Sequence, residues 1–406
     1  MPSKILVINC GSSSIKSQLF ESAGEQNLAR GLVSRIGEKQ PHFTQETAAG
    51  KLEQDCQAAD HEQAFDVLTE HLLDPQAGLL RSTADVVAVG HRVVHGGEDF
   101  VSSTLITDQV IAGIEKYVPL APLHNPPNLV GIRAAQHHFP ESMHVAVFDT
   151  AFHQTIPPEA FLYGLPYELY EKYRLRKYGF HGTSHRFVSQ RAAELIGKPL
   201  EELKLVTNHL GNGSSITAVD RGKSVDTSMG MTPLEGVVMG TRTGDVDAGA
   251  VLFLAQKENL SWQQLDDLMN RRGGLLGISG ISNDLRTIEK AAAEGHYRAQ
   301  LAVKIFANRV RRFMGAYVVI LGGADAIVFT GGIGENAVAM RARICAGLER
   351  LGIILDPQRN EACHAQEMFI STDDSPIKLL VVPTNEELLI MRDTLQVAEA
   401  ALAHAP

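Results

Sequence analysis

Apolar residues follow two kinds of pattern along the chain, short continuous runs and positions repeated every three or four residues. The apolar run at 5–8 indicates a buried strand, and the mostly apolar segments 85–89 and 143–148 also predict strands. From Glu62 to Leu73 the apolar residues recur at helical spacing, which predicts an amphipathic helix. Further elements are predicted as helices at 296–320, 336–351 and 386–403 and as a strand at 326–329. The pattern as a whole indicates a mixed α/β protein.

One arrangement of strand, Gly/Ser turn and second strand occurs twice. The first copy covers 6–15 and the second covers 206–216, in a chain of 406 residues. This repeat predicts two related halves. Hairpin turns commonly carry Gly and Ser, so two unrelated hairpins are the alternative. We place the boundary between the halves near residue 150, because the Pro- and Tyr-rich stretch 157–178 predicts irregular structure.

The composition is that of a globular protein with an excess of acidic groups. Hydrophobic residues make up 44% and charged residues 21% of the chain, which excludes wholesale disorder. The net charge of −10 argues against nucleic acid or an anionic membrane as a partner. No apolar stretch approaches the roughly 20 residues that cross a bilayer. The four cysteines form no C-x-x-C pair, so we expect a cytoplasmic protein without a disulfide or zinc framework.

Three Gly-rich turns are candidates to receive a phosphorylated ligand. The turns at 9–16 and 211–215 combine closely spaced backbone N–H groups with hydroxyls, which suits phosphate oxygens. The segment 329–336 follows a predicted strand and opens a helix, so its glycines would let a ligand approach the backbone. Neither the Walker A pattern nor the G-x-G-x-x-G fingerprint is present, which leaves a P-loop and a Rossmann site unsupported. Plain turns are the alternative at each place.

Two arginines and two carboxylates are candidates for binding and catalysis. Arg92 and Arg242 lie in Gly-rich segments, and the guanidinium fork matches carboxylate or phosphate oxygens. Asp149 follows the predicted strand 143–148, and Glu386 follows a predicted strand at 379–382 and a turn. Side chains at these strand ends face the ligand crevice of α/β proteins. A structural salt bridge is the alternative for each arginine, and a helix cap or solvated turn is the alternative for each carboxylate.

The histidine-containing segment 181–185 invites a metal interpretation that its sequence does not support. His181 and His185 have the i, i+4 spacing of a zinc-binding helix, but the Glu of H-E-x-x-H is missing and Gly182 disfavours a helix. Ser184 lacks the G-x-S-x-G context of a hydrolase nucleophile. We therefore expect neither a zinc site nor a serine hydrolase here.

Taken together, the motifs resemble those of the acetate/propionate kinase family over essentially the whole chain. The matching runs are N-C-G-S-S-S-I-K (9–16), G-H-R-V-V-H-G-G (90–97), A-P-L-H-N-P (121–126), V-F-D-T-A-F-H-Q-T (147–155), Y-G-F-H-G-T-S-H (178–185), H-L-G-N-G-S-S (209–215), D-T-S-M-G-M-T-P-L-E-G (226–236), M-G-T-R-T-G-D (239–245), F-T-G-G-I-G-E-N (329–336) and P-T-N-E-E (383–387). The resemblance implies an α/β, duplicated ribonuclease-H-like (actin-like) two-domain fold with a central nucleotide cleft. It implies an N-terminal domain of residues 1–150 plus 387–406 and a C-terminal domain of residues 151–386, the latter for nucleotide binding and dimerisation.

The same resemblance implies roles for individual residues. The catalytic residues would be Arg92, Arg242, His181 and Asp149. Acetate would contact Arg92, Val94, Leu123, Pro233 and Phe180. Asn9 and Glu386 would hold Mg²⁺, which Mn²⁺ could replace. ATP would be bound by Asn9, Ser12, Ser14, Lys16, His209, Gly211, Asn212, Gly213, Asp284, Leu285, Arg286, Gly332, Ile333, Gly334 and Asn336.

The reaction that the resemblance implies is reversible, Mg²⁺-dependent transfer of a phosphoryl group from ATP to acetate, in a cytoplasmic homodimer. The chemistry suits these residues, because a carboxylate nucleophile is already ionised near pH 7 and needs alignment and charge neutralisation rather than a strong base. Three alternatives stay open: a propionate kinase or another short-chain carboxylate kinase, a kinase of the same fold acting on an alcohol, and a non-catalytic actin-like ATP-binding protein.

Two positions bear on specificity. Members of the family that prefer propionate commonly carry Ala where this chain has Val94, so the larger Val should narrow the pocket and favour acetate. One methylene is worth about 1–3 kcal/mol in such a pocket, so the preference should be partial. The chain also departs from the family's frequent Lys-Glu-Ser at Arg271, Arg272 and Gly273, which leaves the nucleotide preference open.

Overall fold

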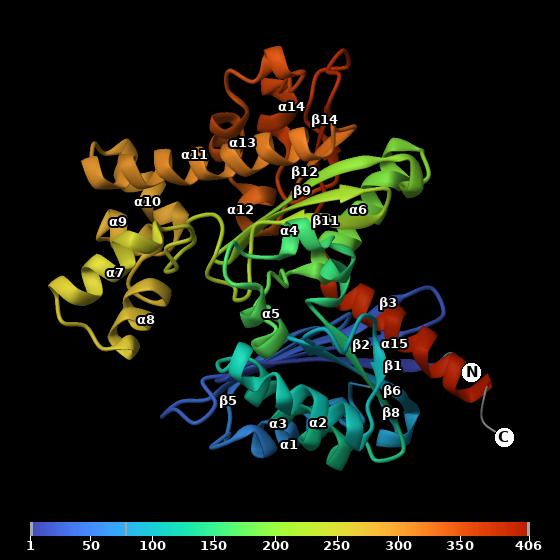
Figure 1. Cartoon of the computed structure of the whole chain (residues 1–406). Helices are drawn as coiled ribbons and strands as arrows, with labels where there is room; N and C mark the ends of the chain where they lie inside the picture. The colour runs from blue at the N-terminus through green and yellow to red at the C-terminus, as the bar shows by residue number, and fades with distance from the viewer. Residues whose placement is uncertain (1–2, 78, 404–406) are drawn as a thin grey trace. The chain divides into compact units, whose positions relative to one another are not determined.

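The computed structural model describes residues 3–77 and 79–403, and the chain divides into two compact units with one β-sheet each (Figure 1). Unit 1 comprises Met1–Ala151 and Asn385–Pro406, and unit 2 comprises Phe152–Thr384. The strands are β1 (Lys4–Cys10), β2 (Ser14–Glu21), β3 (Gln26–Ser34), β4 (His42–Thr47), β5 (Gly50–Asp55), β6 (Val86–Val93), β7 (Thr104–Leu105), β8 (Met143–Phe148), β9 (Lys204–Leu210), β10 (Ser214–Asp220), β11 (Lys223–Thr227), β12 (Ala326–Thr330), β13 (Met368–Phe369) and β14 (Lys378–Val381). The α-helices are α1 (His61–Leu72), α2 (Asp108–Lys116), α3 (Asn125–His138), α4 (Pro158–Phe161), α5 (Tyr167–Tyr173), α6 (Gly182–Ile196), α7 (Ala248–Lys257), α8 (Trp262–Asn270), α9 (Gly274–Ser279), α10 (Leu285–Ala293), α11 (Tyr297–Ile320), α12 (Gly331–Asn336), α13 (Val338–Cys345), α14 (Pro357–Ala362) and α15 (Glu386–Ala403).

The sheet of unit 1 has the strand order β5-β4-β3-β2-β1-β6-β8-β7 and is covered on both faces. Successive residues of a strand point to opposite sides, and in β1 both sides are apolar. Leu6 and Ile8 pack in one cluster with residues of α1 and α3, whereas Ile5 and Val7 pack in another with residues of α15. The last helix of the described chain therefore completes the core that the first strand begins.

The sheet of unit 2 has the strand order β11-β10-β9-β12-β14-β13. Val206 of β9 belongs to the cluster that the long helix α11 covers with Phe306 and Val310. The next residue, Thr207, bonds to His185 of α6, so α6 lies on the opposite face. Helices α7 to α10 follow β11 and precede α11 (Figure 1). This helical segment supplies part of the site described below.

The two sheets share one topology. The order β3-β2-β1-β6-β8-β7 in unit 1 corresponds to β11-β10-β9-β12-β14-β13 in unit 2. In each sheet an antiparallel hairpin, β1–β2 or β9–β10, is followed by parallel pairing to β6 and β8 or to β12 and β14. The predicted fold class, a duplicated ribonuclease-H-like (actin-like) α/β fold, is therefore confirmed.

Most predicted elements are present, and two expectations need correction. Strand β8 and helix α15 have the predicted bounds of 143–148 and 386–403. The predicted helix at 336–351 is shorter, because α13 ends at Cys345 before Gly347, which adopts a φ of 73°. The expectation that Gly182 disfavours a helix is wrong, since α6 begins at this residue. Glycine at the first helical position avoids the cost that it carries in a helix interior.

Candidate active site

Arg92 and Asp149 form the centre of the candidate site in unit 1. Arg92 lies near the end of β6, and Asp149 directly follows the neighbouring strand β8. Arg92 Nε donates to Asp149 Oδ1 at 3.0 Å and Nη2 donates to Oδ2 at 2.7 Å, a bidentate pair. Burial alone would lower the pKa of Arg92, but the carboxylates of Asp149 and Glu386 outweigh it and raise the pKa. The Nη1 edge of the guanidinium makes no hydrogen bond to another described residue.

Glu386, the first residue of α15, brings a second carboxylate to the same arginine. Its Oε2 lies 3.9 Å from Arg92 Nε. Burial, followed by the negative charges of Asp149 and Glu387, raises the pKa of Glu386 to about 7 against the opposing effect of Arg92. One guanidinium thus faces several carboxylates, an arrangement that an additional cation would stabilise.

The hairpin turn between β1 and β2 is anchored by the helices beneath it. His61 Nε2 of α1 lies 2.8 Å from the Gly11 carbonyl oxygen, and Asn128 Nδ2 of α3 donates to the Cys10 carbonyl at 2.8 Å. Asn9 and Lys16 are paired across the hairpin, and Gly11 N–H donates to the Ser14 carbonyl within the turn. The side chains of Ser12 and Ser14 are not used by these anchors.

Val94 and Leu123 are the residues of unit 1 that were predicted to contact the methyl group of acetate. Asn128 of α3 accepts a hydrogen bond from the backbone N–H of Val94, at 3.1 Å, just beyond β6. Leu123 precedes α3 and is half exposed. The Asn128 side chain therefore fixes the backbone of Val94 close to Arg92, whereas Leu123 is half exposed.

In unit 2, Arg242 and His181 face the hairpin turn between β9 and β10. A side chain added at Gly213 of this turn would lie 3.4 Å from His181 Nε2 and 3.6 Å from Arg242 Nη1. Asn212 is held in place because Gly240 N–H donates to its carbonyl and Asn283 Nδ2 donates to its Oδ1. The structure therefore brings together three predicted residues, His181, Arg242 and Asn212.

The guanidinium of Arg242 has no carboxylate within ion-pair distance among residues 3–77 and 79–403. Its Nη1 donates to the Pro233 carbonyl oxygen at 3.1 Å and contacts Met239 Sδ at 3.7 Å. Burial lowers the pKa of Arg242. A desolvated cation that has only neutral partners is a favourable binding point for an anion from solution.

His181 and Phe180 lie at the start of α6. His181 adopts a left-handed φ of 56° as the residue before the helix, and its Nδ1 lies 2.8 Å from Ser215 Oγ. The rings of His181 and His209 are stacked with centroids 4.2 Å apart. Phe180 is buried, and its carbonyl oxygen accepts a hydrogen bond from His153 Nε2 at 2.9 Å.

A cavity of about 680 Å³ lies in unit 2 between the β9–β10 turn, the start of α10 and α12. Its volume is in the range of pockets that hold a nucleotide-sized ligand. Eight of the predicted ATP-binding residues line it, namely Gly211, Asn212, Asp284, Leu285, Arg286, Gly332, Ile333 and Asn336. The remaining lining residues, Asn283, Glu289 and Ala337, were not predicted.

Some predicted residues lie outside the lining of this cavity. In unit 2 they are His209, Gly213 and Gly334, and the predicted ATP-binding residues of unit 1, Asn9, Ser12, Ser14 and Lys16, do not line it either. Gly334 is buried, and an added side chain there would meet the backbone of Phe329 at 3.3 Å, so this glycine serves the strand-to-helix turn. Arg271 and Arg272, where the chain departs from the family pattern, do not line the cavity either.

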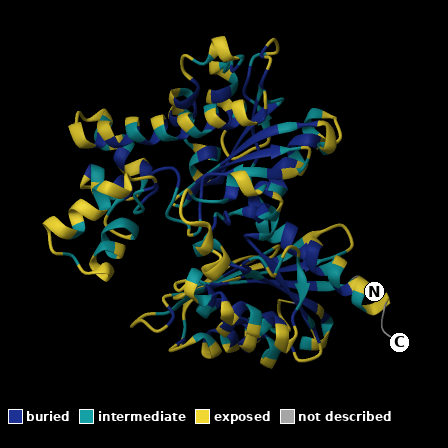
Figure 2. Ribbon diagram, in the orientation of Figure 1, coloured by how far each residue is buried: buried dark blue, intermediate teal, exposed yellow. Residues whose placement is uncertain are grey.

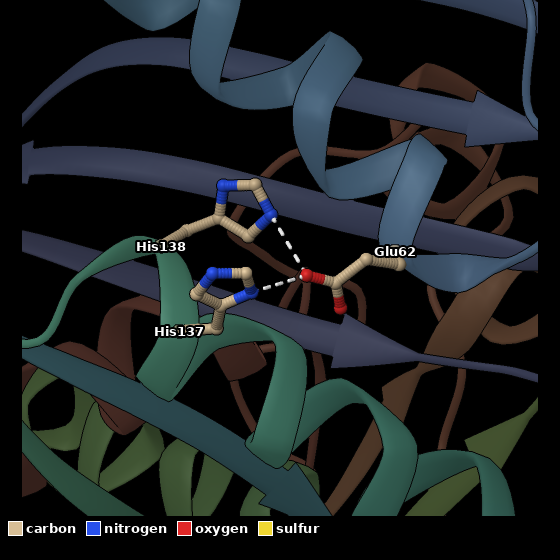
Figure 3. Close-up of side chains that lie close together, drawn as sticks. All are labelled: Glu62, His137 and His138. Atoms are coloured by element: carbon tan, nitrogen blue, oxygen red, sulfur yellow. Dashed lines mark hydrogen bonds and ion pairs between the residues drawn. The ribbon is translucent and has the colours of Figure 1, made fainter.

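Glu62, His137 and His138 form the only group of three or more His, Cys, Asp or Glu side chains, among the described residues, whose ligand atoms lie within 4.8 Å of one another. Figure 3 shows Glu62 of α1 facing the two histidines at the end of α3, with its Oε1 2.6 Å from His137 Nδ1 and 3.5 Å from His138 Nε2. Glu62 and His137 are exposed, so we interpret the group as an ion-pair cluster between two helices, which adds little stability. The predicted metal-binding residues Asn9 and Glu386 do not belong to it.

Comparisons with known proteins agree with one another over nearly the full length. The model of the acetokinase family matches residues 4–392. An acetate kinase of Desulfitobacterium hafniense is 52% identical over 98% of this chain and 99% of its own, and one of Methanosarcina acetivorans is 53% identical over 98% and 97%. The crystal structure of Porphyromonas gingivalis acetate kinase has a TM-score of 0.93 at 44% identity, covering 97% of this chain and 99% of that one. A propionate kinase from Francisella tularensis has a TM-score of 0.91 at 42% identity, covering 97% and 100%.

The duplicated fold and the nucleotide-sized cavity beside an unpaired arginine define a phosphotransferase of the actin-like class. The chain belongs to the acetokinase family. Within the described residues, no helix has the length and apolar character that crossing a membrane requires.

Proposed function

We propose that the protein catalyses reversible transfer of the γ-phosphoryl group of ATP to acetate, giving acetyl phosphate and ADP. The observation that carries the proposal is Arg242, a desolvated guanidinium without a carboxylate partner that faces the Gly213 turn beside the cavity. Full-length relatives that are named acetate kinase support the choice of acetate. In this proposal the cavity of unit 2 receives the adenosine, and the two Gly/Ser turns receive the phosphates.

The acceptor carboxylate is ionised at neutral pH, so direct in-line attack on phosphorus needs no general base. What the residues must do is hold two anions together. In the proposal, Arg242 and the free Nη1 edge of Arg92 bind the acetate and the transferred phosphoryl group, and His181 donates a hydrogen bond to a phosphoryl oxygen. Asp149 orients Arg92 through its bidentate bond. Val94, Leu123, Pro233 and Phe180 would enclose the methyl group.

A divalent cation fits the acidic part of unit 1. Glu386 and Asn9 offer the oxygen ligands that Mg²⁺ prefers. Burial, and after it the negative charges of Asp149 and Glu387, raises the pKa of Glu386, and a bound cation would favour its ionised form. We propose that these two residues hold Mg²⁺, with Mn²⁺ as a substitute. The bound ion would neutralise phosphate charge during transfer.

A hydroxylamine trap tests the proposed reaction. The protein is incubated with MgATP, acetate and hydroxylamine, and acetyl hydroxamate is measured against reactions that lack ATP or contain Arg242→Ala. The proposal expects hydroxamate that depends on both ATP and acetate. The second candidate is a propionate kinase, which the similarity to the Francisella tularensis structure supports. Hydroxamate formed with propionate but not with acetate would favour it. Slow ATP hydrolysis that is insensitive to either acid would instead indicate a non-catalytic ATP-binding protein.

We also propose that two copies associate through unit 2. Leu252 and Phe253 of α7 and Trp262 of α8 are exposed apolar residues. Figure 2 colours each residue of the ribbon by its burial. Large apolar side chains that are exposed and gathered into a patch are typical of an interface, and these three come from two consecutive helices. Sedimentation velocity should give a dimer for the parent protein and a monomer for Phe253→Glu. The exposed Val101 of unit 1 supplies the control, because Val101→Glu should leave the dimer intact.

A further inference from the structure

A chain of buried hydrogen bonds leads from β9 to the imidazole of His181. Thr207 Oγ1 of β9 lies 2.7 Å from His185 Nδ1 of α6. His185 Nε2 lies 2.7 Å from Ser215 Oγ of β10, and the same oxygen lies 2.8 Å from His181 Nδ1. Thr207, His185 and Ser215 are completely buried, so water cannot replace a missing partner at any of them.

The direction of the first hydrogen bond follows from the surroundings of Thr207. Among the described residues, the Thr207 hydroxyl has His185 Nδ1 as its only hydrogen-bond partner. A buried O–H without an acceptor is costly, whereas a hydroxyl oxygen that accepts nothing is tolerated better, so Thr207 donates. His185 Nδ1 therefore accepts. Burial keeps the pKa of His185 well below its usual value and the ring neutral, so its proton is on Nε2.

The second and third bonds then have fixed directions. His185 Nε2–H donates to Ser215 Oγ, and the Ser215 hydroxyl proton is left to donate to His181 Nδ1. A doubly protonated His181 would place a second N–H against Ser215 Oγ and leave the Ser215 proton without an acceptor. We propose that Thr207, His185 and Ser215 are positioning residues that hold His181 as the neutral tautomer with its proton on Nε2.

This assignment deepens the proposed phosphoryl transfer and rests on it for its purpose. His181 Nε2 is the ring atom that faces the Gly213 turn, where Arg242 Nη1 also lies. With the proton on Nε2 the ring donates to an anionic phosphoryl oxygen, whereas the opposite tautomer would present a lone pair and repel it. The i, i+4 spacing of His181 and His185, which resembles a zinc motif, lets both rings reach one serine hydroxyl from one helical turn.

Nitrogen-15 NMR of the histidine-labelled protein tests the tautomer without any turnover. Loss of signals in His181→Asn and His185→Asn assigns the two rings. We expect Nε2 protonated and Nδ1 unprotonated for both histidines at pH 7.5, and a mixture of tautomers for His181 in Thr207→Val and Ser215→Ala. A proton on Nδ1 of His181 in the parent protein, or an unchanged tautomer in both variants, would overturn the proposal even if the protein is an active acetate kinase.

Kinetics then test the consequence. Ser215→Ala should lower kcat about 10²-fold and Thr207→Val about tenfold, with the KM values for acetate and MgATP within roughly twofold, because loss of the donor acts in the transition state. Thr207→Ser keeps the hydroxyl and should restore kcat. Ser224→Ala is the matched control, since Ser224 makes a similar buried bond to His153 Nδ1, at 2.8 Å, that involves no ring nitrogen of His181 or His185. Equal losses of kcat in Ser224→Ala and Ser215→Ala would show a structural effect only and contradict the proposal.

Discussion

Each unit holds one arginine in a Gly-rich segment, and the surroundings of the two guanidinium groups differ. Arg92 of unit 1 is neutralised by a bidentate bond to Asp149, with Glu386 close by. Among the residues that the structure describes, the guanidinium of Arg242 in unit 2 meets only the Pro233 carbonyl and a methionine sulfur. The sequence left two interpretations open for both residues, an anion clamp and a structural salt bridge. The structure shows a salt bridge for Arg92, whose Nη1 edge is still available to an anion, whereas Arg242 has no counterion among the described residues.

Alanine substitution of the two arginines gives the largest expected effects and tests the comparison directly. Arg92→Ala and Arg242→Ala should each lower kcat on the order of 10³-fold, as for other charge clamps in phosphoryl transfer. Their effects on stability should differ. Arg92→Ala leaves buried carboxylates unpaired and should lower the free energy of unfolding by about 3 kcal/mol. Arg242→Ala removes an unpaired charge and should leave stability unchanged or higher.

Urea denaturation and steady-state kinetics on both variants provide the measurement. Arg92→Lys and Arg242→Lys keep the charge but lose the planar fork, so they should recover stability more than turnover. Near-normal turnover in both alanine variants would contradict the proposed role of the two arginines in phosphoryl transfer. If Arg242→Ala loses as much stability as Arg92→Ala, the proposed difference between a salt-bridged and an unpaired guanidinium is wrong.

Acid should weaken both units through buried histidines. His91 and His144 of unit 1 share a hydrogen bond of 3.0 Å, and burial lowers the pKa of each. In unit 2, burial lowers the pKa of His153 from 6.5 to about 4. The folded state favours the neutral ring, so this stability is fully present above pH 6.5 and is lost as the pH falls towards 4. For His153 alone the loss would be about 3 kcal/mol.

Hydrogen exchange measured by mass spectrometry at pH 7.5 and 5.5, corrected for intrinsic rates, follows both units in one experiment. His153→Gln should flatten the pH dependence of opening in unit 2 and leave that of unit 1 unchanged. His144→Gln should do the reverse. A pH dependence that neither variant alters would mean that other groups control acid unfolding.

The smallest expected effect concerns the acid that is bound. Val94 is fixed beside Arg92 by the Asn128 side chain, and we expect it to limit the space for the alkyl group of the substrate. The parent protein should have a higher kcat/KM for acetate than for propionate. Val94→Ala should shift this ratio towards propionate by about tenfold, the value of one methylene in an apolar pocket. Equal kcat/KM values for the two acids in the parent protein would contradict the assignment of Val94.

The sequence was most informative where a pattern is local. The apolar run of β8 and the helical spacing of α15 gave their bounds, and the repeated hairpin indicated the duplication that the two sheets confirm. Residues that act through distant partners were missed. Asn283 matters because it clamps Asn212 from another element, and Thr207 matters because His185 of α6 lies over it. Neither relation leaves a periodic signal in the sequence.

The error at Gly182 has a related cause. An average helix propensity ignores position, and this glycine is the first residue of α6 rather than an interior one. His181 and His185, which have the spacing of a zinc motif, share one serine hydroxyl in the structure. The spacing lets both imidazole rings bond to Ser215, which is paired with His209 across the β9–β10 hairpin.

Helix α15 has a consequence for how the chain matures. It covers the Ile5 and Val7 face of β1 and lies so close to Gly90 that an added carbon there would be 2.2 Å from Thr394 Oγ1. During synthesis, all of unit 2 emerges from the ribosome before this helix does. Unit 2 is continuous in sequence and can close its own core early, while β1 still has one apolar face uncovered. Strand β1 is thus among the last elements of unit 1 to have both of its apolar faces covered.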